Sequence, residues 1–163
     1  MDGRYNVGID HIRTLAITCH ALDGQFDTLF SSQTICGRSS RISDSYRRLF
    51  SVSLLNLAIS IRVSLSGESE YTKENSGVEA CGAFENGAPK EDGGFTVKDV
   101  CDKIIHATNI SKPIELDVVG ACSRLSGHYN KKPWEFDLGV SIFCEWVLKW
   151  LEDIEDRPTQ RHT

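Results

Sequence analysis

Apolar residues recur every three or four positions in four stretches of the chain, and this spacing is typical of amphipathic helices that bury one face. The stretches predict helices over residues 10–30, 43–65, 96–106 and 140–156. The second helix has the widest apolar face, which is made by Tyr46, Leu49, Phe50, Leu54, Leu57, Ala58, Ile61 and Leu65. We therefore expect this helix to lie in the core.

Side chains that can cap a helix stand at the start of three of these stretches. Asp10 is a candidate N-cap of the first helix, and Ser43 or Asp44 of the second. Thr96 is followed three residues later by Asp99, a near match to a capping box that also places an acid in the first turn. These caps set the expected starts of the three helices.

Apolar and polar residues alternate with a period of two over residues 114–120 and again over residues 134–138. This alternation predicts two short strands, and the polar residues 127–133 predict the turn between them. We expect the strands to form a small antiparallel β-hairpin just before the C-terminal helix.

The composition changes over residues 67–94, where six glycines accompany many polar residues. Such a segment has little apolar surface to bury, so we expect a flexible loop with a short ribbon near residues 78–84. The polar tail 157–163 is expected to be disordered. Residues 1–163 then form a single α+β domain that is mainly helical, an antiparallel helix bundle with the small hairpin added.

The net charge of −5 argues against a broad surface for nucleic-acid phosphates, because such surfaces need clustered Lys and Arg. A local basic cluster, which we interpret as solvated surface, is formed by Arg38, Arg41, Arg47 and Arg48. The chain has no run of eighteen apolar residues and opens with polar ones, so we expect a cytoplasmic protein without a membrane anchor.

The six cysteines are scattered, with no C-x-x-C pair and no histidines at a metal-binding spacing. This pattern indicates neither a zinc site nor a disulfide framework, and it is typical of small buried hydrophobes. We expect the protein to need no metal and no cofactor.

Candidate chemistry lies on the helix that follows Thr96. Asp99, Asp102, Lys103 and His106 follow one another at i, i+3, i+4 and i+7, so they share one face of the helix. A histidine four residues after an aspartate can act as a proton-transfer unit. The alternative interpretation is an ordinary surface pair at a helix end.

The end of this helix resembles the helical signature of the HEPN superfamily, whose nuclease members carry the pattern R-N-x-x-x-H. The matching residues are Cys101, Asp102, Lys103, Ile104, Ile105 and His106. Asp102 and His106 match the polar residue and the histidine, whereas Cys101 stands in place of the arginine. In that family the arginine and histidine act together on an RNA phosphate at sites built across dimers. The resemblance therefore implies a helical subunit that self-associates and has lost part of its catalytic pair.

A second arginine can supply the missing guanidinium if the second and third helices are neighbours. Arg62 and Asn56 interrupt the apolar second helix, and both are expected to meet polar partners. The two helices are expected to pack antiparallel through Leu54, Leu57, Ala58 and Ile61 against Val97, Val100, Cys101 and Ile104. His106 would then lie at the margin of the contact, within reach of Asn56 or Arg62. The alternative for Arg62 is a solvated or salt-bridged side chain.

Two further groups are candidates of the same kind. Arg13 and His20 stand seven residues apart on the first helix and fit a looser arginine–histidine pattern, or else form a partly buried pair that positions the helix. An aromatic and basic turn could stack on a base while its cations meet phosphate, or could be a plain exposed hairpin; it comprises His128, Tyr129, Lys131, Lys132 and Trp134.

Three functional hypotheses follow. The first is a non-catalytic or degenerate HEPN-like subunit of a bacterial defence or toxin–antitoxin type system, which acts by binding a protein partner or a second copy of itself. The second is a metal-independent ribonuclease with His106 as acid/base, Asp102 orienting it, and Arg62 or Arg13 stabilising charge. The third is a nucleotide or small-molecule sensor that uses the same pocket.

Overall fold

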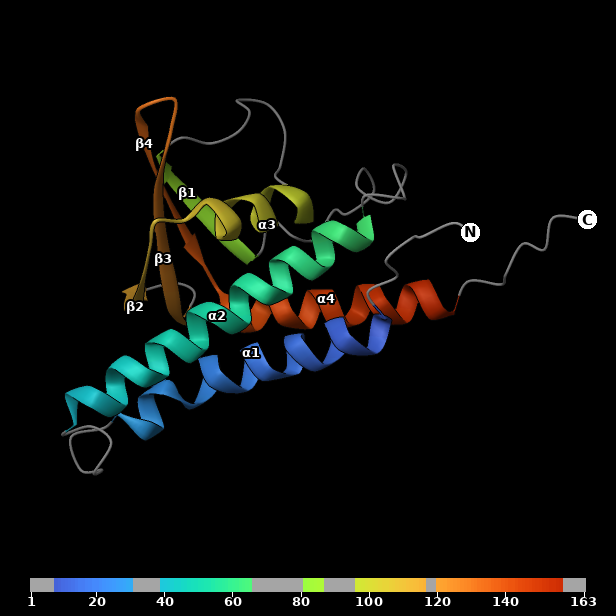
Figure 1. Cartoon of the computed structure of the whole chain (residues 1–163), viewed down its shortest axis with the longest axis horizontal. Helices are drawn as coiled ribbons and strands as arrows, with labels where there is room; N and C mark the ends of the chain where they lie inside the picture. The colour runs from blue at the N-terminus through green and yellow to red at the C-terminus, as the bar shows by residue number, and fades with distance from the viewer. Residues whose placement is uncertain (1–7, 31–38, 66–80, 87–95, 117–119, 157–163) are drawn as a thin grey trace, which may run out of the picture.

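The computed structural model describes residues 8–30, 39–65, 81–86, 96–116 and 120–156, which form four helices and four strands (Figure 1). The helices are α1 (Ile9–Leu29), α2 (Ser40–Leu65), α3 (Val97–His106) and α4 (Val140–Glu155). The strands are β1 (Gly82–Asn86), β2 (Asn109–Leu116), β3 (Gly120–Tyr129) and β4 (Lys132–Leu138). The fold is thus α+β and mainly helical, as the apolar pattern predicts.

The four predicted helices are confirmed, but two of their predicted caps are wrong. α1 begins one residue before Asp10, with Gly8 at the N-cap and no side-chain bond there, so Asp10 is a first-turn acid that complements the helix dipole. α2 begins three residues before Ser43, and the Oγ of Ser39 accepts a hydrogen bond from the backbone N–H of Ile42. Ser39, just outside the helix, therefore makes the capping hydrogen bond that was expected of Ser43 or Asp44.

The helices pack with their apolar faces together, and α1 contacts both α2 and α4 (Figure 1). α3 runs antiparallel to α2 and packs on it, and its other side contacts β3. The predicted contact faces of α2 and α3 are all buried, namely Leu54, Leu57, Ala58, Ile61, Val97, Val100, Cys101 and Ile104. One member of the predicted α2 face is wrong, because Leu49 is 53% exposed.

The four strands form one antiparallel sheet in the order β1-β4-β3-β2. The hairpin before α4 is present, but its first strand is β3 and not residues 114–120. Residues 114–116 belong to β2, which pairs with the other edge of β3, and 117–119 lie outside the described residues. β3 has the sequence GACSRLSGHY, and its small and polar residues conceal the alternation that marks a strand.

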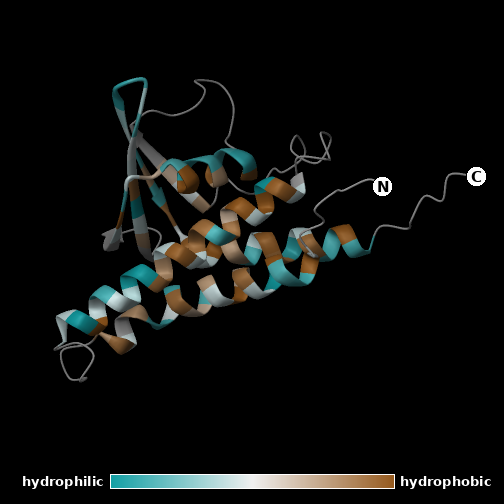
Figure 2. Ribbon diagram, in the orientation of Figure 1, coloured by the Kyte–Doolittle hydropathy of each residue, from teal (hydrophilic) through white to brown (hydrophobic). Residues whose placement is uncertain are grey.

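The predicted turn 127–133 is much shorter in the structure, because β3 continues to Tyr129 and β4 starts at Lys132. Asn130 and Lys131 form the whole turn, with φ values of 49° and 65°. Positive φ at both central residues is the geometry of a two-residue hairpin turn that matches the twist of its strands. The turn is the most polar part of the sheet in Figure 2.

One described part of the predicted flexible loop 67–94 is ordered. Cys81 is buried, and β1 follows it as an edge strand paired with β4. This strand overlaps the short ribbon expected near residues 78–84. The other loop residues, 67–80 and 87–94, and the predicted disordered tail 157–163 lie outside the described residues.

The core lies between the helices and one face of the sheet. β3 and β4 direct Leu125, Trp134, Phe136 and Leu138 toward the helices, and all four are buried. Apolar residues run along α2 and α4, where the two helices meet this core (Figure 2). Within the described residues, no helix combines the length and the apolar character that a bilayer-crossing segment needs.

Candidate functional site

α3 positions the candidate residues, and its start is well defined by local chemistry. The Thr96 side chain accepts a hydrogen bond from the backbone N–H of Asp99, and the Asp99 carboxylate accepts from the Thr96 backbone N–H at 2.8 Å. The predicted capping box is therefore confirmed. Asp99 is committed to this cap, so the polar stripe of α3 contributes Asp102 and His106 to further chemistry.

The structure brings Arg62 and Asp102 together. Arg62 Nε donates to Asp102 Oδ1 at 2.7 Å, across the contact between α2 and α3. The two side chains are 32% and 36% exposed, so the pair lies at the rim of the core and is partly accessible to solvent. A guanidinium from α2 thus lies beside Asp102, as expected if Arg62 supplies the arginine that α3 lacks. Arg62 is equally the salt-bridged arginine of the alternative interpretation.

His106 is the last residue of α3, and its side chain is exposed. The imidazole makes no hydrogen bond or ion pair with the residues that the structure describes, Asn56 and Arg62 included. Its backbone is close-packed, because a Cβ added at Gly127 would lie 2.8 Å from the His106 carbonyl oxygen. The ring therefore leaves a fixed helix end and points into solvent.

Cys101 occupies the position of the missing arginine, and it is fully buried between α3 and α2. Burial raises the pKa of its thiol strongly, and the negative charge of Asp102 raises it further, against a smaller opposite effect of Arg62. The thiol is protonated at neutral pH and can neither bind a phosphate nor act as a nucleophile. α3 therefore carries no guanidinium at the position where the resembling family has arginine.

Lys103, the remaining cation of the stripe, is directed away from Asp102. Its Nζ lies 4.4 Å from the centroid of the buried Trp134 ring, a cation–π contact between α3 and β4. Burial lowers the pKa of Lys103, and Asp99 opposes that shift. This contact ties α3 to the sheet and covers Trp134, so in the base-stacking alternative for the turn this ring is not available to a base. Tyr129, at 72% exposure, is the aromatic side chain of the turn that is open to solvent.

The described ion-pair partners of Arg13 and His20 lie on α1 and α4, and none lies on α3. Arg13 donates to Asp10 and to Glu155, and His20 lies 3.1 Å from Glu145. Because Glu145 and Glu155 belong to α4, both residues join α1 to α4. The structure therefore favours the positioning role that was the alternative for this pair.

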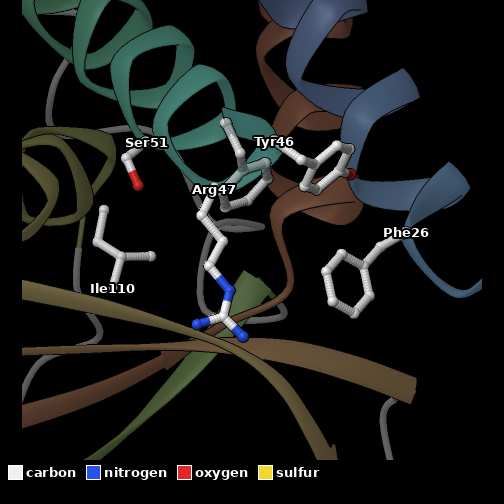
Figure 3. A pocket seen from close by; sticks show the side chains of 6 residues that line it. Phe26, Tyr46, Arg47, Ser51 and Ile110 are labelled. Carbon is white, nitrogen blue, oxygen red and sulfur yellow. The ribbon is translucent and has the colours of Figure 1, made fainter. Parts of the chain in front are cut away.

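A small hollow lies between the N-terminal half of α2, α1 and β2 (Figure 3). It has about 240 Å³ of open space and is lined by Phe26, Tyr46, Arg47, Phe50, Ser51 and Ile110. The Arg47 side chain extends from α2 toward the strands. That space includes open solvent, and the enclosed cavity is only about 10 Å³. Ligand pockets are typically roughly 300–1,000 Å³, so this hollow is too small for a nucleotide.

Within the described residues, a row of exposed apolar side chains runs along α2, on a face that was not among the predicted sites. We call it the α2 stripe, and it consists of Ile42, Leu49, Val52, Asn56, Ile59 and Val63. The five apolar members are between 40% and 55% exposed. The six members are spaced by seven, three, four, three and four residues, the pattern of a heptad seam, and this signal is readable in the sequence. The buried Tyr46, Phe50, Leu54 and Leu57 masked it, because α2 is apolar on two faces.

A second missed feature is a buried ion pair on the outer face of the sheet. Arg124 of β3 donates two hydrogen bonds of 2.7 Å to Asp137 of β4, directly opposite in the register. Asp137 is only 1% exposed. The pairing depends on the β3–β4 register, so it was not visible in the sequence.

Comparisons with protein-family models, with curated proteins and with solved structures gave no match. The function is therefore argued from the geometry of the α2 stripe and of the Arg62–Asp102 pair.

Proposed function

We propose that this chain works by binding a protein partner through the α2 stripe, as a non-catalytic or degenerate HEPN-like cytoplasmic subunit of a bacterial defence or toxin–antitoxin type system. The proposal rests on five large apolar side chains that are exposed along one face of α2. A contiguous exposed apolar surface is costly in water and marks interaction sites in soluble proteins.

The chemistry at the end of α3 supports a binding role over a catalytic one. Cys101 is buried and protonated where a nuclease of the resembling family has arginine. Arg62 is engaged by Asp102, which partly neutralises its charge. An RNA phosphate would have to compete with that carboxylate for the guanidinium.

The test uses a partner identified by co-purification from the native host and then purified for titration calorimetry. Val52→Glu places a charge in the middle of the α2 stripe and should weaken binding about 30-fold or more, the loss typical of a central interface residue. Ile17→Glu is the matched control, because Ile17 is equally exposed, at 53%, but lies on α1. Equal affinity of the Val52→Glu variant and the unsubstituted protein would refute the proposal.

A metal-independent ribonuclease is the second candidate, and one observation favours it. Arg62 stands against Asp102, one helical turn before the exposed His106, so a guanidinium and an imidazole share one rim of the domain. His106 would act as acid/base and Arg62 would hold the phosphate. Asp102, which accepts from Arg62, would orient the guanidinium.

Cleavage of single-stranded RNA in the presence of a chelator tests this candidate. Loss of cleavage in His106→Ala, with full activity in His128→Ala, would support it, because His128 is also exposed but lies on β3. Undiminished cleavage by His106→Ala would remove this histidine from any mechanism.

A further inference from the structure

We propose that the occupant of the α2 stripe is a second copy of this chain, bound so that the two α2 helices run antiparallel across a two-fold axis at Asn56. The proposal rests on the partner-binding function above and names the partner. It requires that the stripe be complementary to itself when reversed, which is the condition for a two-fold interface.

The spacing of the stripe meets that condition. Leu49 and Val52 precede Asn56 by seven and four residues, and Ile59 and Val63 follow it by three and seven. When the helix is reversed about Asn56, Leu49 therefore faces Val63 of the second copy, and Val52 lies one residue from the level of Ile59. Each of these four large side chains thus has a large apolar counterpart, whereas Ile42 would face residue 70, which lies outside the described residues.

Asn56 gives a chemical reason for a second copy over an unrelated partner. It is the one polar member of this set, and it is exposed in the single chain. A carboxamide both donates and accepts hydrogen bonds, so two Asn56 side chains across the axis satisfy each other. An apolar partner surface would leave the amide without hydrogen-bond partners, which is unfavourable. A single asparagine in an apolar helix seam is a known device for fixing register.

Charge selects the antiparallel orientation. Arg41, Arg48 and Arg62 are spaced by seven and fourteen residues, so they lie along one edge of the stripe. The C-terminal half of this edge also carries Asp102 from α3, joined to Arg62. Arg41 and Arg48, in the N-terminal half, are exposed and make no ion pair with a described residue.

The two halves of the edge are therefore complementary. In an antiparallel pair, Arg48 of one copy lies level with residue 64 of the other, close to the Arg62–Asp102 pair of that copy. A parallel pair would instead place each Arg48 at the level of the other Arg48. The pattern of apolar residues allows both orientations, whereas the charges favour the antiparallel one.

Cysteine cross-linking distinguishes these arrangements, with Cys36→Ser as the background, because the other five cysteines are buried. In the antiparallel dimer Asn56→Cys links to itself, and a mixture of the Leu49→Cys and Val63→Cys variants links to each other. Leu49→Cys alone does not link, because the two copies of residue 49 are about 21 Å apart and a disulfide needs Cα atoms within roughly 7 Å. Efficient linking of Leu49→Cys alone would overturn the antiparallel arrangement.

Sedimentation equilibrium gives the second readout. The unsubstituted protein should be a dimer, Val52→Glu should raise the dimer dissociation constant about 100-fold or more, and Ile17→Glu should leave it unchanged. A strict monomer at concentrations up to about 100 µM would overturn the second copy as occupant. If such a monomer still bound another protein in a manner sensitive to Val52→Glu, the partner-binding function would survive. A dimer insensitive to Val52→Glu would refute the proposed dimer interface.

Discussion

Arg62 on α2 and Asp102 on α3 lie forty residues apart in the chain and are joined by a hydrogen bond of 2.7 Å at the rim of the core. A second arginine–aspartate pair, Arg124 and Asp137, has the same bond length but a carboxylate that is 1% exposed instead of 36%. The two pairs therefore have similar chemistry in different surroundings. Their difference decides how much each contributes to stability.

Replacing each arginine by methionine should show that difference. Arg62→Met should lower the free energy of unfolding by less than about 1 kcal/mol, because water can solvate Asp102. Arg124→Met should cost about 3 kcal/mol, because it leaves the Asp137 carboxylate buried without its cation. Urea unfolding of the two variants measures both values. Equal losses would contradict the assignment of Asp137 to a buried pair.

Gly127 of β3 lies close to both β4 and the end of α3. A Cβ at this position would lie 2.5 Å from Trp134 Cζ2 and 2.8 Å from the His106 carbonyl oxygen. Gly127→Ala should therefore destabilise the protein by about 1–3 kcal/mol, the usual cost of overpacking. Thermal unfolding followed by circular dichroism tests this.

Gly24→Ala is the control for the Gly127 substitution. Gly24 lies inside α1, and a Cβ there would meet no atom within 4 Å. Alanine should stabilise the helix by about 0.5–1 kcal/mol, because it restricts the unfolded chain and favours helix. A destabilised Gly24→Ala variant would show that the Gly127 result does not report local crowding alone.

The buried thiols should make the protein less stable in alkali. Burial raises the pKa of Cys81 from 9.0 to about 11. Between these pH values the unfolded chain loses the thiol proton and the folded protein keeps it, so the free energy of unfolding falls as pH rises. The contribution is fully present below pH 9 and amounts to about 2–3 kcal/mol when lost.

Cys101 and Cys144 should act in the same direction. A hydrogen bond with the neighbouring Cys19, which stabilises the protonated thiol, and burial raise the pKa of Cys144, and burial raises that of Cys101. Urea unfolding from about pH 8 to about pH 10.5 measures the slope, and Cys81→Ala should make it shallower. A slope unchanged by Cys81→Ala would exclude Cys81 as a contributor.

Asn56 should lower the affinity of the proposed dimer while it fixes the register of the two α2 helices. Asn56→Leu removes the only polar residue between Leu49 and Val63 in the α2 stripe, so it should tighten self-association while weakening the preference for one register. Sedimentation equilibrium should then show a lower dissociation constant. The Leu49→Cys variant should begin to cross-link with itself in the Asn56→Leu background. Unchanged affinity and cross-linking would show that Asn56 lies outside the interface.

Local patterns in the sequence determined the helices and one of their starts. The three-to-four periodicity located all four helices, and Thr96 with Asp99 specified the start of α3, because a capping box involves only neighbouring residues. The packing of α2 on α3 was also predictable, since it joins the two clearest apolar faces of the chain.

Tertiary structure decided what depends on pairing between distant segments. β3 carries small and polar residues, so its position in the sheet follows from its two neighbouring strands and not from its own alternation. Arg62 and Asp102 were each candidates in the sequence, but only the crossing of α2 and α3 joins them and leaves His106 in solvent. The α2 stripe became visible as a surface only when the core had covered the other apolar face of the helix, because periodicity shows which residues share a face and not which face is buried.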